Sequence, residues 1–119
     1  MSQLARLDLD DRDDVVIARI AGELDLSNVH DIGDALTGAL PSGAAGLVLD
    51  LSELEHIDSA GIRLVYDLRG RLGTARQALA VVVPPDAPIH EVLDLAAVPA
   101  TVPLHGDLDS AVTTARAGA

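Results

Sequence analysis

Residues 47–72, LVLDLSELEHIDSAGIRLVYDLRGRL, contain an apolar run, a polar segment and an amphipathic run in immediate succession. The apolar run at 47–51 favours a buried strand, and the spacing of apolar residues from 59 to 72 is typical of a helix. The polar segment ends at Asp58-Ser59-Ala60-Gly61, which places a hydroxyl at the first turn of that helix. We expect the rest of the chain to repeat this order of strand, loop and helix.

Strand and helix patterns alternate on both sides of this segment. The expected upstream elements are an edge strand at 3–9, an acidic turn at 8–14, a buried strand at 15–21, a loop at 22–25, and a helix that begins after Ser27 or Asn28 and stops at Pro41. The expected downstream elements are a strand at 78–83, a short helix after it, an edge strand at 101–104, and a helix from Asp107 to about Ala117. The short helix is expected to be capped by Asp86, to end at Pro99, and to have Ile89, Val92, Leu93 and Ala96 on its inner face.

This alternation predicts an α/β fold with an open, mainly parallel sheet of four to five strands and about four helices. A chain of 119 residues suits a single domain, residues 1–119. Sites in such sheets gather at the carboxyl ends of strands. We therefore expect the loops at 22–25 and 56–61 to meet at one rim.

The composition excludes several classes of partner. Eight arginines face nineteen acidic residues, and the net charge of −11 disfavours nucleic acid and anionic membranes. No apolar run reaches the roughly 20 residues that span a bilayer, so we expect no membrane insertion. A cytoplasmic protein is the simplest expectation.

Ser59 follows Asp58, which is a good helix N-cap residue. A phosphate on Ser59 would lie near the positive end of the helix dipole, and Arg63, one turn later, could pair with it. Asp58 and Asp25 would oppose the added charge. On these residues alone Ser59 is either a structural residue, the commoner case, or a modification site.

Three motifs in this order resemble the STAS domain, named for sulfate transporters and anti-sigma-factor antagonists. They are Gly22-Glu23-Leu24-Asp25, Leu47-Val48-Leu49-Asp50-Leu51-Ser52 and Ile57-Asp58-Ser59-Ala60-Gly61-Ile62. The resemblance extends from about Leu4 to Ala115. The family often has a second serine after the first, and Ala60 replaces it here.

The resemblance implies a stand-alone anti-anti-sigma factor with no cofactor. Its unphosphorylated form would bind an anti-sigma factor, often a GHKL-type serine kinase, and release the sigma factor. Phosphorylation of Ser59 would abolish binding, and a PPM-type phosphatase would restore it. The expected partner-binding residues are Asp25, Ile57, Asp58, Ser59, Ala60, Gly61, Ile62 and Arg63.

Other functions compete with this interpretation. His56 precedes Ser59 by three residues, but no G-x-S-x-G motif surrounds the serine, so we expect no enzyme. The four histidines are scattered and the acidic turn lacks EF-hand spacing, so we expect no metal site. A STAS subunit of a membrane transporter assembly, for example in lipid transport, or of a stress-signalling complex remains the alternative.

Overall fold

The apolar run at the centre of the sequence forms strand β3, Gly46–Asp50, in which all five residues are buried. The computed structural model describes residues 5–117. The other strands are β1 (Ala5–Arg12), β2 (Val15–Leu24), β4 (Leu54–Ile57), β5 (Ala78–Val82) and β6 (Leu104–His105). The helices are α1 (Val29–Ala39), α2 (Ser59–Thr74), α3 (His90–Leu95), α4 (Leu108–Arg116) and the short 3₁₀ helix η1 (Val98–Ala100).

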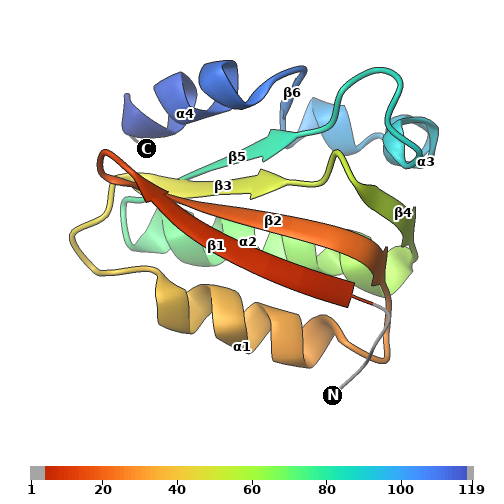
Figure 1. The fold of residues 1–119 in the computed structure, drawn as a ribbon, viewed down its shortest axis with the longest axis horizontal. Coiled ribbons are helices and arrows are strands. Elements are labelled where there is room, and N and C mark those ends of the chain that lie inside the picture. Colours follow the sequence, from red (N-terminus) through yellow and green to blue (C-terminus); the bar gives the residue numbers. More distant parts are fainter. Residues whose placement is uncertain (1–4, 118–119) are drawn as a thin grey trace.

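The strands form one sheet in the order β1-β2-β3-β5-β6, and β4 pairs with the end of β2 (Figure 1). β1 is antiparallel to β2, whereas every other pair is parallel. The prediction of an α/β fold with a mainly parallel sheet is therefore confirmed, although the sheet has six strands rather than four or five. The additional strand is β4, in the segment expected to be a polar loop.

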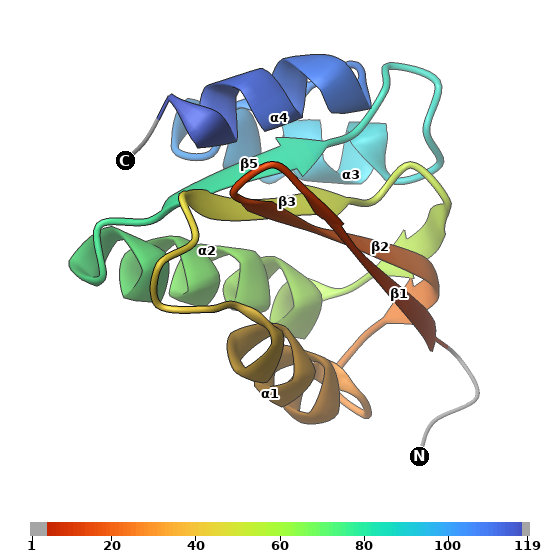
Figure 2. The same ribbon diagram turned by 60° about the vertical axis from the view of Figure 1, so that its left-hand side comes forward.

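Helices cover both faces of the sheet, with α1 and α2 on one side and α4 on the other (Figure 2). Successive side chains of β2 and β3 point alternately toward the two helical layers, because side chains along a strand alternate between its two faces. Leu47 and Leu49 join the larger core under α1 and α2, whereas Val48 joins the smaller core under α4. Burial of the central strands on both faces explains their nearly continuous apolar sequence.

The boundaries of the first two strands differ from the expectation. β1 extends to Arg12, so the acidic turn shrinks to Asp13-Asp14, with φ of 57° at Asp13. The expected start of this strand at Gln3 lies outside the described residues. β2 continues to Leu24 because its register shifts after Gly22, where φ is 94°. Glycine adopts this conformation without steric cost, so the expected loop at 22–25 is mostly strand.

The short helix α3 also differs from the expected helix that Asp86 would cap and Pro99 would end. Asp86 is not its cap, because α3 begins at His90 with Ile89 in the N-cap position. Val92 was expected on the inner face, but 43% of it is exposed, and Ala96 is exposed too. Pro99 does not end α3, which stops at Leu95, and lies instead within η1.

The end of the chain follows the prediction more closely. β6 lies at the sheet edge as expected, but it comprises Leu104–His105, so residues 101–103 of the expected strand at 101–104 are not strand. Asp107 caps α4, because its carboxylate accepts a hydrogen bond from the Ser110 backbone amide at 2.7 Å. In residues 5–117, no helix combines the length and the apolar character needed to cross a membrane.

Candidate functional site

Asp58 joins the start of α2 to the loop that follows β2. Its Oδ1 accepts a hydrogen bond from the Gly61 amide at 3.0 Å, which confirms Asp58 as the N-cap. Its Oδ2 accepts from the Leu26 amide at 3.2 Å, and its own amide donates to the Leu24 carbonyl at 3.3 Å. The two loops that were expected to meet at one rim are thus bonded to each other through one residue.

These bonds also govern the ionisation of Asp58. The Gly61 amide is the main cause that lowers the pKa of the Asp58 carboxyl, and partial desolvation opposes it. The Leu26 and Ala60 amides and the nearby His56 lower the pKa further. The charged form of Asp58 is therefore the form that the folded rim stabilises.

Asp58→Asn is expected to remove part of the acid sensitivity of the fold. A group with a lowered pKa stabilises the folded state fully above its unfolded pKa, about 3.9 for aspartate, and loses that contribution as the pH falls through the folded pKa. Asparagine still caps a helix with its one acceptor oxygen, but it does not titrate and cannot also accept from the Leu26 amide, so the variant should be about 1 to 3 kcal/mol less stable near pH 7. Urea unfolding at pH 7 and pH 3 measures both values. The stability difference between wild type and variant should shrink at pH 3, and a constant difference would contradict the assignment.

The loop between β2 and α1 is held by the buried amide of Asn28, which is 3% exposed. Its Oδ1 accepts from the Asp25 amide at 3.0 Å, and its Nδ2 donates to the Glu23 carbonyl at 2.9 Å. Asn28 occupies the N-cap position of α1, as one of the two predicted options, but its side chain makes no capping bond. Sequence reasoning missed this role, because a polar residue before a helix is normally interpreted as its cap.

Asp25 lies on the same loop and is partly exposed. Its Oδ1 accepts hydrogen bonds from the amide, at 2.9 Å, and the hydroxyl of Ser27. This is an Asx-turn, which fixes the carboxylate beside the start of α1. The bond from Leu26 to Asp58 then places this carboxylate on the same rim as the start of α2.

Gly61 allows α2 to approach the sheet closely. A Cβ atom at this position would lie 2.5 Å from Ile57 Cγ1 and 2.8 Å from the Leu24 carbonyl oxygen. Both distances are too short for a side chain, so glycine at this position lets the helix lie this near the sheet. Gly61 is buried and Ile57 is only 3% exposed. These two residues therefore lie beneath the accessible surface of the rim, and their expected contact with a partner stays a prediction.

The remaining predicted residues are accessible to different degrees. Ser59 and Arg63 are exposed, whereas Asp58, Ala60 and Ile62 are partly buried. Ile62 packs against the core but is not fully covered, so part of its apolar surface is accessible. Within residues 5–117, Arg63 forms no ion pair. We use the name switch rim for the accessible set Asp25, Asp58, Ser59, Ala60, Ile62 and Arg63.

A groove of about 280 Å³ between α1 and α2 continues the switch rim. Ala60 and Arg63 belong to both surfaces. Leu26, which is 73% exposed, stands at the edge of this groove and was not singled out from the sequence. The groove is lined by Leu26, Val29, His30, Gly33, Asp34, Ala60, Arg63, Leu64, Asp67, Leu68 and Arg71.

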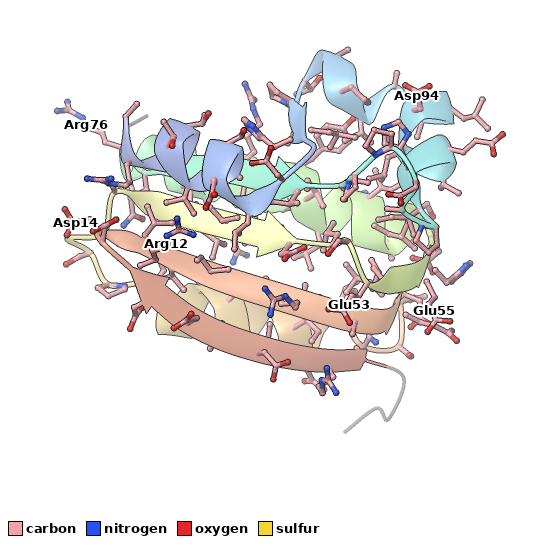
Figure 3. All side chains as sticks on the ribbon, turned by 45° about the horizontal axis from the view of Figure 1, so that its top comes forward. Arg12, Asp14, Glu53, Glu55, Arg76 and Asp94 are labelled. Carbon is pink, nitrogen blue, oxygen red and sulfur yellow. The ribbon has the colours of Figure 1, made fainter. Side chains whose placement is uncertain are left out.

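Apart from Ser59, the residues considered for catalysis or metal binding do not belong to the switch rim. His56 is exposed on β4, paired with Glu23 of β2, and not in the loop expected for it. Among the described residues, no group of three His, Cys, Asp or Glu side chains is arranged to hold a metal ion. Figure 3 shows Glu53 and Glu55 near β4, so acidic side chains border this end of the sheet.

A family model described as "Mlab, STAS domain" matches residues 5–104. The chain belongs to the STAS domain family. No protein with a curated description matches it.

Several solved structures share the fold of this STAS domain. An anti-sigma factor antagonist from Mycobacterium paratuberculosis is 26% identical, with 94% of each chain covered and a TM-score of 0.82. The anti-sigma factor antagonist SpoIIAA in its unphosphorylated form is 20% identical, with 94% of this chain and 97% of that chain covered and a TM-score of 0.74. SpoIIAA from Bacillus in its phosphorylated form is also 20% identical, with coverages of 92% and 98% and a TM-score of 0.66.

Proposed function

We propose that this STAS domain is an anti-sigma-factor antagonist controlled by phosphorylation of Ser59. The observation that carries the proposal is the exposed Ser59 hydroxyl at the first residue of α2, directly after the Asp58 cap that joins both loops of the rim. The 26% identical antagonist, which covers nearly the whole chain, supports the same role. In this proposal the unphosphorylated rim binds an anti-sigma factor and so frees the sigma factor.

A phosphate on Ser59 would change the surface more than the fold. It would add about 1.5 to 2 negative charges at pH 7. The positive end of the α2 dipole and Arg63, which forms no ion pair within residues 5–117, would stabilise those charges, which favours a folded phosphorylated state. Asp25 and Asp58 already make the rim acidic, so a partner that docks against it would meet a much stronger negative field.

The docking surface in this proposal is the switch rim together with the groove between α1 and α2. The exposed Leu26 supplies apolar area at the junction of the two, and Arg63 and Arg71 supply positive charge along the groove. Apolar area with a charged border is typical of protein interfaces. The proposed partners are a GHKL-type serine kinase that acts as the anti-sigma factor and a PPM-type phosphatase, in the cytoplasm. We infer that catalysis belongs to these partners.

A kinase assay tests the proposal directly. The anti-sigma candidate, ATP and the protein are incubated, and the phosphate is located by mass spectrometry of peptides. We expect stoichiometric phosphate on Ser59 in the wild type and none in Ser59→Ala. Phosphate on another residue, or undiminished labelling of the variant, would refute the assignment of Ser59.

A transporter role is the second candidate, because part of the murine Slc26a9 anion transporter shares this fold at 20% identity with a TM-score of 0.72. Here the same surface would bind a subunit of a membrane transporter assembly. Co-purification with a transporter subunit by both wild type and Ser59→Glu, without binding to any anti-sigma factor, would favour this role. A stress-signalling complex would instead be found as a large soluble assembly.

A further inference from the structure

Strand β1 exposes one complete edge, because β2 is its only neighbour in the described sheet. The strand, ARLDLDDR, places charged residues on one face and leucines on the other near its start. Arg6 and Asp8 lie on the charged face, form a 3.3 Å ion pair, and have side chains that are 71% and 57% exposed. Exposed edge strands of this length are templates for pairing with a further strand.

We propose that this edge pairs with the β1 edge of a second copy of the chain, in an antiparallel register centred on Leu7. A twofold axis at Leu7 puts Arg6 of each copy directly opposite Asp8 of the other. Directly opposite residues of antiparallel strands share a face, so two new ion pairs form across the axis. The contact would extend over residues 5–9 of both strands and would continue the antiparallel arrangement of β1 and β2.

The charges of β1 select this register over its neighbours. An axis at Arg6 would put that arginine opposite itself, and an axis at Asp8 would do the same for the aspartate. An axis at Leu9 would oppose Asp8 with Asp10 and Arg6 with Arg12. Like charges directly opposite each other destabilise a sheet, so among these four registers only the one at Leu7 is free of such pairs.

The apolar face of β1 agrees with the same axis. Leu7 pairs with Ile20 and packs against the core on the α1 and α2 side. Leu9 pairs with Ala18 on that side, yet 49% of it is exposed. In the proposed register Leu7 meets its own copy and Leu9 lies opposite Ala5 of the second copy, which covers apolar surface now open to water.

The far half of β1 is tied to α4 through a side chain, although its backbone edge is as open as the rest. Arg12 donates to Asp109 of α4 at 2.7 Å, and Figure 3 shows Arg12 on the same side of the molecule as Asp14. With the axis at Leu7, the described residues that face one another across the two strands are Ala5–Leu9, and these form the contact. Five residues per strand make a small contact, and two copies with a charge of −11 each repel, so the dimer should be weak and transient.

Sedimentation equilibrium at protein concentrations up to about 1 mM, the range of weak association, tests the proposal. We expect a monomer–dimer equilibrium for the wild type. Arg6→Asp and Asp8→Arg should each weaken dimerisation about tenfold or more, because each turns both cross-strand attractions into repulsions. An equimolar mixture of the two variants should form a heterodimer, since Asp at position 6 then faces Arg at position 8. The double variant should regain the wild-type equilibrium.

Two control variants carry the same changes in net charge elsewhere. Arg69→Asp lies on the exposed face of α2, and Asp94→Arg lies on α3, far from β1 in Figure 3. Each control should dimerise as strongly as its change in net charge allows, without a further loss. A mixture of the two controls should show no preference for the heterodimer. A wild type that stays monomeric at the highest concentration, or a mixture of Arg6→Asp and Asp8→Arg without heterodimer, would overturn the proposal. The proposed function does not depend on this result, because none of these residues belongs to the switch rim.

Discussion

Ser59→Glu is expected to bind the anti-sigma partner on the order of a hundredfold more weakly than the wild type, since a like charge brought to a docked surface costs several kcal/mol. Ser59→Asp should be weakened in the same direction. Ser59→Ala should bind at wild-type strength and should keep that strength after incubation with kinase and ATP. The reason is position, because Ser59 is exposed at the first turn of α2 and no described hydrogen bond depends on its hydroxyl. Isothermal titration calorimetry with the purified partner measures all three.

A serine at the other end of the sheet provides the matched control. Ser42 is exposed in the turn after α1, away from the carboxyl ends of the strands where the switch rim lies. Ser42→Glu adds the same charge and should leave the affinity unchanged. Equal affinity of Ser59→Ala, Ser59→Glu and wild type would contradict the proposed switch, and thermal melts must show that all variants remain folded.

Strand β3 and helix α2 could be predicted from the sequence because several local patterns agree at each of them, although β4 between them was missed. The apolar run, the capping aspartate and the helical spacing each point to the same boundaries. Asp58 and Ser59 accordingly occupy the expected positions in the structure. Asp107 and α4 were predictable for the same reason.

The missed features depend on contacts between segments. β4 contains two buried residues, Leu54 and Ile57, separated by exposed Glu55 and His56, and this short pattern does not identify a strand without its neighbour β2. Leu26 likewise gains its position from the bond between its amide and Asp58, 32 positions away in the chain. Local propensity carries no information about such pairings, so the shape of the site was less predictable than its central residues.

The residues in and beneath the switch rim fall into two groups, those that are exposed and those that hold the backbone in place. Ser59 and Arg63 are exposed, whereas Asp58, Gly61 and Asn28 hold the surrounding backbone through hydrogen bonds or close packing. With the backbone held by these bonds beneath an exposed hydroxyl, a phosphate would change the charge of the surface without needing a change of fold. This differs from a segment that must fold or unfold to transmit a signal.

Gly61→Ala is expected to destabilise the protein by about 1 to 3 kcal/mol, the usual cost of adding an atom to a tightly packed site. The new Cβ would collide with Ile57 Cγ1 at 2.5 Å and with the Leu24 carbonyl at 2.8 Å, and this backbone oxygen cannot move without disturbing β2. Gly70 lies on the same helix and would place its Cβ in open space. Gly70→Ala should therefore stabilise by about 0.5 to 1 kcal/mol through helix propensity alone.

Urea denaturation of both variants measures this contrast, and the two identical substitutions should have effects of opposite sign. Because alanine retains the amide that donates to Asp58, a loss of stability in Gly61→Ala reports on steric contact and not on a lost cap. A displaced α2 should also shift Ser59 relative to Asp25, so Gly61→Ala should weaken partner binding while Gly70→Ala does not. If both variants gained stability equally, the close packing of α2 on β2 and β4 could not be what positions the switch rim.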